Sequence, residues 1–231
     1  MLALGAVVLA YLVGSLSFAV IVSRLMGMAD PRSYGSGNPG ATNVLRSGRK
    51  GAALATLVLD ALKGWLPTAL AVAFASQLGW SEWVPALVAL AAVCGHLWPL
   101  WFGFKGGKGV ATIAGALVGL NPWLGLIALA AWLAVAVVTR YSSLAALVAA
   151  VVAPLGQLLI WGGSPTAVAV GVMSLLLIWR HMGNIGKLMA GTESRIGGGK
   201  AAPAADPHHP QASHPKPHSH GKDKHGHHHP H

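Results

Sequence analysis

Three polar segments interrupt an otherwise apolar chain, and each combines glycines with Lys, Arg, His or Asn. The first comprises residues 36–46, with Gly35 beside it. Its glycines would let consecutive backbone N–H groups converge on an anion, and the planar guanidinium of Arg46 suits a phosphate. The alternative is an ordinary glycine-rich turn between membrane segments. The candidate substrate ligands in this first polar segment are Gly35, Ser36, Gly37, Asn38, Gly40, Thr42, Asn43 and Arg46.

The second polar segment, residues 95–112, has the composition of a phosphate-binding loop, with glycines, two lysines and a helix start after them. It is not a nucleotide-binding P-loop, because Gly109 and not Ser or Thr follows Lys108. His96 could donate a hydrogen bond, act as a general base or simply end a helix. The candidates in this segment are His96, Lys105, Gly106, Gly107 and Lys108.

The third polar segment, residues 179–193, contains His181 and Asn184. These two residues would share a helix face, because they are three positions apart. Ser143 adds a hydroxyl from a short polar connection elsewhere in the chain. The apolar region offers no Ser–His–Asp set, no Cys–His pair and no cluster of metal ligands, so we expect neither a metal nor another cofactor.

Asp60 and Lys63 form a charged pair inside an apolar run, also three positions apart. Pairing lowers the cost of carrying charge at that depth. Two interpretations remain open: the pair lines a polar substrate site, or it is a salt bridge that locks a helix.

The elements that must position these residues are membrane-spanning helices. The chain is 54% hydrophobic and only 10% charged, with a mean hydropathy of +0.57, and its apolar runs approach the ~20 residues that span a bilayer. We therefore predict an all-α, polytopic integral membrane protein with a retained first helix. Seven transmembrane helices are expected near residues 2–22, 52–75, 83–100, 109–120, 122–139, 144–161 and 165–180.

The distribution of Lys and Arg predicts the orientation of the chain, because basic loops favour the cytoplasm. Connections after the first, third, fifth and seventh predicted helices are basic, whereas residues 76–82, 120–122 and 162–164 contain no Lys or Arg. The N-terminus is thus expected outside, with the C-terminus and all three polar segments in the cytoplasm. Residues 1–195 form one membrane domain, and the Pro- and His-rich tail, residues 196–231, is expected to be disordered.

The motifs GSGNPGATNVLR, GHxxP followed by FKGGKGVAT, RYSSL, and WRHxxNIxKLxxGTE occur in this order. This set resembles the acyl-phosphate:glycerol-3-phosphate acyltransferase family (PlsY) over residues 1–195. The resemblance implies transfer of a fatty acyl group from acyl phosphate to the sn-1 hydroxyl of glycerol 3-phosphate, at the cytoplasmic face of a bacterial inner membrane. The residues that match the family's functional positions are Ser36, Arg46, His96, Lys105, Lys108, Ser143, His181 and Asn184. Of these, Ser36, Lys105, Lys108, His181 and Asn184 are the expected catalytic residues.

This interpretation suits the residues, because an acyl phosphate is already activated and needs positioning and charge stabilisation more than a protein nucleophile. The base would be a substrate phosphate oxygen or His181. Membrane lipids and a soluble or peripheral supplier of acyl phosphate are the expected partners, and nucleic acid is not. Two alternatives remain: an acyltransferase that uses acyl-CoA or acyl carrier protein, and a transporter of small phosphorylated solutes in which Asp60 and Lys63 form the pathway.

Overall fold

The computed structural model describes residues 1–197, which form helices and connecting loops with no strand among them. The predicted all-α class is therefore confirmed for this part of the chain. Most of the expected disordered tail lies outside the described residues. The elements are α1 (Leu2–Gly14), α2 (Phe18–Leu25), α3 (Ala41–Arg46), α4 (Lys50–Phe74), α5 (Trp83–Leu97), the 3-10 turn η1 (Leu100–Phe102), α6 (Val110–Leu120), α7 (Pro122–Thr139), α8 (Ser142–Trp161), α9 (Pro165–Arg180) and α10 (Met182–Met189).

Several helix boundaries follow directly from local chemistry. Helix α7 starts with Pro122, whose missing N–H costs nothing in a first helical turn. The side chain of Asn121 accepts the N–H groups of Trp123 and Leu124 at 3.0 and 3.4 Å. Helix α9 starts in the same way after Ser164. The short polar connections predicted at residues 120–122 and 162–164 are thus helix caps.

The predicted continuous helix over residues 2–22 is wrong. Helix α1 ends at Gly14, and α2 starts at Phe18 at an angle of 46° to it. The carbonyl of Leu16, in the break, accepts a hydrogen bond from the Lys63 ammonium at 2.6 Å. A side chain from α4 thus satisfies a backbone group that the helix no longer pairs, which is how broken helices are tolerated inside membrane proteins.

Within residues 1–197, four helices are long and apolar enough to cross a membrane, and the bent pairs α1–α2 and α9–α10 would bring the number to six. Helix α6 has only 11 residues. Large apolar side chains such as Leu54, Val138 and Leu159 are exposed on the outside of the bundle. A lipid-facing surface explains this exposure, since in water such a surface would be unfavourable.

Helices α4 and α6 form the most extensive contact in the structure. A Cβ atom added to Gly64 would lie 2.1 Å from the Thr112 carbonyl oxygen, and one added to Gly115 would lie 1.9 Å from that of Ala61. The two backbones therefore touch through glycines from both sides, as is common between membrane helices. This contact fixes the position at which α6, and the loop before it, begins beside α4.

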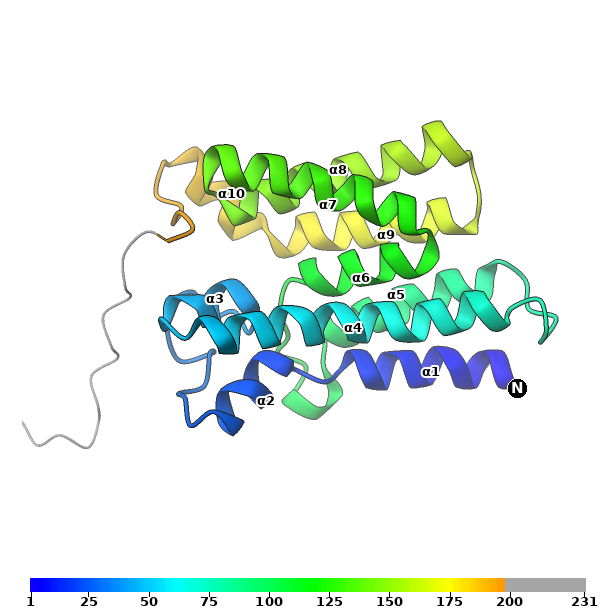
Figure 1. The fold of residues 1–231 in the computed structure, drawn as a ribbon, viewed down its shortest axis with the longest axis horizontal. Helices are drawn as coiled ribbons and strands as arrows, with labels where there is room; N and C mark the ends of the chain where they lie inside the picture. Colours follow the sequence, from blue (N-terminus) through cyan, green and yellow to red (C-terminus); the bar gives the residue numbers. More distant parts are fainter. Residues whose placement is uncertain (198–231) are drawn as a thin grey trace, which may run out of the picture.

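Figure 1 shows the helices side by side along the long axis of the molecule, with the N-terminus at one end. Helices α2, α3 and α10 lie at the opposite end, together with residues 190–197. The N-terminal end also carries the half-exposed Trp83 and the exposed Trp123, and Trp is typical of the level where a bilayer meets water. The polar loops are gathered at the opposite end, with α2, α3 and α10.

Candidate active site

The first and second polar segments face each other across a cavity of about 390 Å³. Its lining comprises Arg32, Gly37 and Pro39 on one side and Lys105 and Gly106 on the other. Arg32 forms an ion pair with Asp30 at 2.7 Å, whereas Lys105 is exposed at the rim. A hollow with two cations at its wall is suited to an anionic ligand.

Asn43 holds the first polar segment together, so its polar atoms are already engaged. Its side-chain oxygen accepts the N–H of Ser36 at 2.9 Å, and its amide donates to the carbonyls of Pro31 at 2.6 Å and Tyr34 at 3.1 Å. The N–H of Gly37 also bonds within the segment, to the carbonyl of Tyr34. The expected cradle of convergent backbone N–H groups is therefore largely closed, and side chains are left to bind an anion.

The other candidates in the first segment lie at or near its surface. Gly35, Ser36, Gly37 and Thr42 are exposed, whereas Asn38, Gly40 and Arg46 are half-buried. Thr42 comes within 3.3 Å of the Ser142 hydroxyl at the start of α8. Arg46, at the end of α3, donates to the hydroxyl of Ser194. The first polar segment is thus linked to the chain beyond α10.

The second polar segment is clamped from two sides. Arg180, at the end of α9, donates to the carbonyl oxygens of Gly106 at 2.8 Å and Gly107 at 3.1 Å. The N–H of Gly107 donates to the carbonyl of His96 at 3.3 Å. A Cβ on Gly107 would lie 2.3 Å from His96 Nε2 and 2.9 Å from the Pro39 carbonyl oxygen. Gly107 is therefore required for the close approach of the first two segments.

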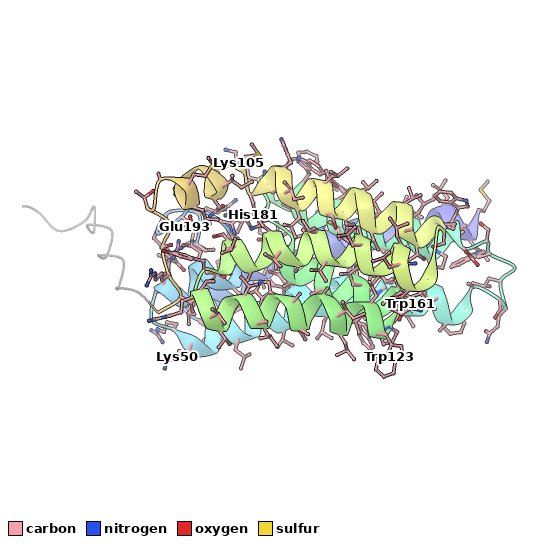
Figure 2. The ribbon with its side chains drawn as sticks, turned by 90° about the horizontal axis from the view of Figure 1, so that it is seen from above. Lys50, Lys105, Trp123, Trp161, His181 and Glu193 are labelled. Atoms are coloured by element: carbon pink, nitrogen blue, oxygen red, sulfur yellow. The ribbon has the colours of Figure 1, made fainter. Side chains whose placement is uncertain are left out.

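Lys108 connects the second segment to the third through a chain of side-chain hydrogen bonds. Its ammonium donates to Asn184 Oδ1 at 2.5 Å, and Asn184 Nδ2 donates to Glu193 Oε1 at 2.9 Å. The same Glu193 oxygen accepts the hydroxyl of Ser143 at 3.0 Å. Lys105, His181 and Glu193 lie at the polar-loop end of the bundle in Figure 2, as does Lys50, away from Trp123 and Trp161.

Burial and neighbouring charges change the proton affinity of Lys108. Burial lowers its pKa to about 8, and the nearby cations Arg46, Lys187 and Arg180 act in the same direction, while Glu193 opposes them. The site therefore has a surplus of positive charge that a bound anion would relieve. A buried lysine whose pKa is perturbed by neighbouring charges is typical of functional sites.

His181 lies between α9 and α10, outside both helices, and only 3% of it is exposed. Its Nδ1 is 2.8 Å from the carbonyl oxygen of Leu177, so Nδ1 carries the hydrogen and Nε2 keeps a lone pair. Burial lowers its pKa to about 4. His181 is thus neutral at physiological pH, with one nitrogen able to accept a proton or hydrogen bond.

Asp60, Lys63 and His96 were expected to bind substrate, but the structure places them beneath the site. All three are buried, and none lines the cavity. Lys63 pairs with Asp60 at 2.7 Å, and His96 Nδ1 lies 3.1 Å from the Thr112 hydroxyl. Their expected contact with substrate remains a prediction.

Sequence reasoning missed three residues of the site as candidates: Arg32, Arg180 and Glu193. Arg180 and Glu193 belong to the motif at residues 179–193, so the motif itself carried a signal. The sequence gives no signal for Arg32 beyond its charge, because its position beside the cavity depends on the turn formed by residues 26–40. Within residues 1–197, no cluster of His, Cys, Asp or Glu side chains could hold a metal ion.

Comparison with known proteins identifies the family. The profile described as "Glycerol-3-phosphate acyltransferase" matches residues 4–191. The chain belongs to this family. Glycerol-3-phosphate acyltransferases of Paraburkholderia phytofirmans and Thiobacillus denitrificans are both 60% identical to it, over 86% and 83% of this chain and 92% and 96% of theirs. The expected family and enzyme class are thereby confirmed.

Two crystal structures of PlsY, described as an integral membrane glycerol 3-phosphate acyltransferase, resemble this family member closely. The glycerol 3-phosphate form is 38% identical, with a TM-score of 0.79, and the alignment covers 84% of this chain and 96% of that chain. The lysophosphatidic acid form is 37% identical, with a TM-score of 0.77 and coverages of 84% and 95%. An acyltransferase embedded in the membrane is therefore confirmed, at the level of the whole fold.

Proposed function

We propose that this glycerol-3-phosphate acyltransferase takes its acyl group from acyl phosphate and transfers it to the sn-1 hydroxyl of glycerol 3-phosphate. The products would be lysophosphatidic acid and inorganic phosphate. The observation that supports this proposal is a cavity between the first two basic segments, joined to the third segment by the hydrogen bonds from Lys108 to Asn184 and from Asn184 to Glu193. Both substrates are phosphorylated, and this cluster of cations suits two phosphates better than one.

The reaction balances without a protein nucleophile. The sn-1 hydroxyl oxygen attacks the carbonyl carbon, the bond between that carbon and the phosphate oxygen breaks, and phosphate departs with the bonding electrons. The hydroxyl proton passes to a phosphate oxygen of a substrate or to His181 Nε2. The ammonium groups of Lys105 and Lys108 and the guanidinium of Arg46 stabilise the charge that builds on the carbonyl oxygen and the departing phosphate.

The remaining candidates would orient the substrates. Asn184 and Ser143 present a hydrogen-bonding edge beside Lys108, and Ser36 is exposed on the facing segment. Gly106 lines one side of the cavity and Gly37 the other; Gly107 adjoins Gly106, and Gly35, Asn38, Gly40 and Thr42 belong to the rim that carries Gly37. Asn43 supports this rim from below. Such positioning is worth more than any single contact when the donor is already activated.

The donor decides between this reaction and its closest alternative. We expect purified protein in lipid nanodiscs to form lysophosphatidic acid from glycerol 3-phosphate and acyl phosphate, and to release phosphate in equal amount. Acyl-CoA and acyl carrier protein are the control donors. Equal or greater rates with either of them would contradict the proposed donor. Uptake of glycerol 3-phosphate into proteoliposomes without acylation would instead support a transporter.

We also propose seven spans in a bacterial inner membrane, with the N-terminus outside and the site facing the cytoplasm. This requires each bent pair to count as one span and short α6 to complete a crossing. It is supported by the gathering of α2, α3 and α10 at one end (Figure 1), where the basic loops lie. A soluble or peripheral enzyme that makes acyl phosphate could then deliver it from the cytoplasm.

The orientation is testable by cysteine labelling in a Cys94→Ala background. Ser81 and Gly163 are exposed, and a side chain on Gly163 would meet nothing within 4 Å. Cysteines at these two positions should react with an impermeant thiol reagent in intact cells. A cysteine at exposed Arg49 is the matched control and should react only after permeabilisation. The opposite pattern would overturn the orientation.

A further inference from the structure

A buried polar cluster lies beneath the cavity, in the middle of the helix bundle. It comprises Asp60 and Lys63 on α4, His96 on α5 and Thr112 on α6, with exposures of 2%, 4%, 7% and 0%. Lys63 Nζ lies 2.7 Å from Asp60 Oδ1, and His96 Nδ1 lies 3.7 Å from the same oxygen. Polar groups buried within a membrane are costly and are retained where they have a role.

On one side, the cluster contacts residues that lead into the first side of the cavity, which carries Arg32 and Gly37. The Lys63 ammonium donates to the carbonyl of Leu16 in the break between α1 and α2, and it lies 5.6 Å from the centroid of the Phe18 ring. Lys63 therefore contacts the last residues before α2 and its first residue. Because α2 leads directly into the segment that carries Arg32 and Gly37, the angle of this break sets where that wall stands.

On its other side, the cluster contacts the second side of the cavity, which carries Lys105 and Gly106. His96 is held by the Thr112 hydroxyl at 3.1 Å and faces the Asp60 carboxylate. Its own carbonyl accepts the N–H of Gly107, and its ring leaves no room for a Cβ on that glycine. A shift of His96 would therefore displace the loop that carries Lys105 and Lys108.

We propose that Asp60 and Lys63 are positioning residues that set the distance between the two walls of the cavity. The pair ties the α1–α2 break to His96, and so couples the two phosphate-binding segments through the core. This inference rests on the proposed function for its catalytic consequence, but the geometric claim stands independently of the substrate. It differs from direct binding, because neither side chain lines the cavity.

The test variant is the double substitution Asp60→Asn with Lys63→Met. It removes both charges while nearly preserving volume, so no buried charge is left without a partner. Thr68→Val is the matched control, because Thr68 is equally buried in α4 but bonds only to Gly64 of its own helix at 2.8 Å. Thr112→Val, which removes only the hydroxyl that holds His96, is a milder second variant in case the double variant does not fold.

Two measurements decide the proposal. The first is the distance distribution between spin labels on cysteines at Leu25 in α2 and Phe104 in the second segment, both exposed, in the Cys94→Ala background. The second is kcat and KM for both substrates. The double variant should broaden or shift the distribution and lower kcat/KM about tenfold to a hundredfold, since displacements near 1 Å have effects of that size. Thr112→Val should act in the same direction by a few-fold, and Thr68→Val should match the wild type in both.

Two outcomes would overturn the proposal. An unchanged distance distribution with lost activity would mean that the pair acts on substrate directly, as the sequence first suggested. Unchanged distances and unchanged kinetics, in the double variant or in Thr112→Val if only that folds, would leave the pair without a positioning role. Failure of the wild-type enzyme to use acyl phosphate would refute the proposed function alone, since the distance measurement needs no substrate.

Discussion

Raising the pH through 8 should remove the positive charge of Lys108 and most of the acyltransfer activity with it. Burial lowers the pKa of this ammonium from 10.5 to about 8, aided by three nearby cations. The protonated form is the one that binds phosphate, so activity is present below this pKa and is lost as the pH rises above it. Because kcat/KM reports on the free enzyme, it should follow the pKa of unliganded Lys108.

The expected size of the effect follows from the protonated fraction. That fraction is one half at the pKa, falls about fivefold over the next pH unit and about tenfold over the unit after that. Between pH 8 and pH 10, kcat/KM should therefore fall by roughly fiftyfold. A bound phosphate stabilises the ammonium, so the alkaline limb of kcat should lie at higher pH than that of kcat/KM.

The assay is initial formation of lysophosphatidic acid between pH 6 and pH 10, corrected for spontaneous hydrolysis of the donor. Lys108→Arg is the informative variant, because arginine stays protonated across this range. Its alkaline limb should disappear even if its rate is lower. Lys105→Arg is the matched control and should keep the wild-type limb. The same limb in Lys108→Arg and the wild type, or a wild-type profile that is flat to pH 10, would refute this reasoning.

Three further predictions concern other parts of the chain. Arg180→Leu removes two charge-assisted hydrogen bonds to the second polar segment, each worth roughly 1.5–3 kcal/mol when fully buried. Because Arg180 is only half-buried, we expect kcat/KM to fall about tenfold to a hundredfold. The control variant Arg195→Leu, at an exposed position, should leave kcat/KM unchanged. His181→Asn should keep much of the wild-type rate, and His181→Ala should mainly raise KM for glycerol 3-phosphate. If the Asn variant binds both substrates but is inactive, His181 is instead the general base, whose loss costs ~10²–10⁴-fold in kcat. Removal of residues 199–231 should leave turnover unchanged in detergent, because the motifs end before them, and a tenfold loss would show that they participate.

The long helices could be predicted from the sequence because the signal for them is local. Apolar runs predicted at residues 52–75 and 122–139 correspond to α4 (Lys50–Phe74) and α7 (Pro122–Thr139). Composition alone required burial or lipid contact along these helices. The distribution of basic residues predicted that the three polar segments lie together, and in the structure hydrogen bonds from Lys108 to Asn184 and from Arg46 to Ser194 link them.

The break in the first helix could not be predicted, because its cause is distant in sequence. Gly14 and Ser15 weaken the helix locally, but the hydrogen bond that satisfies Leu16 in the break comes from Lys63, 47 residues away. The role of Asn43 was hidden for the same reason: an Asn beside glycines suggests a ligand, whereas here it holds three backbone groups. Chemical type can be read from the sequence, but which partner satisfies each polar group depends on the fold.

The glycine contact between α4 and α6 also determines the depth at which the chemistry takes place. Thr112, in the first turn of α6, lies beside Gly64, and Gly64 is about 21 Å along α4 from its start at Lys50, at 1.5 Å per residue. The first turn of α6 therefore lies well below the start of α4, while the loop before it rises to the exposed Lys105 at the polar-loop end. Water can also attack the carbonyl carbon of an acyl phosphate and release phosphate. A donor whose hydrocarbon chain lies in lipid at the level of α6 would leave only its mixed anhydride near the cavity beside Lys105, which limits how much of it meets water.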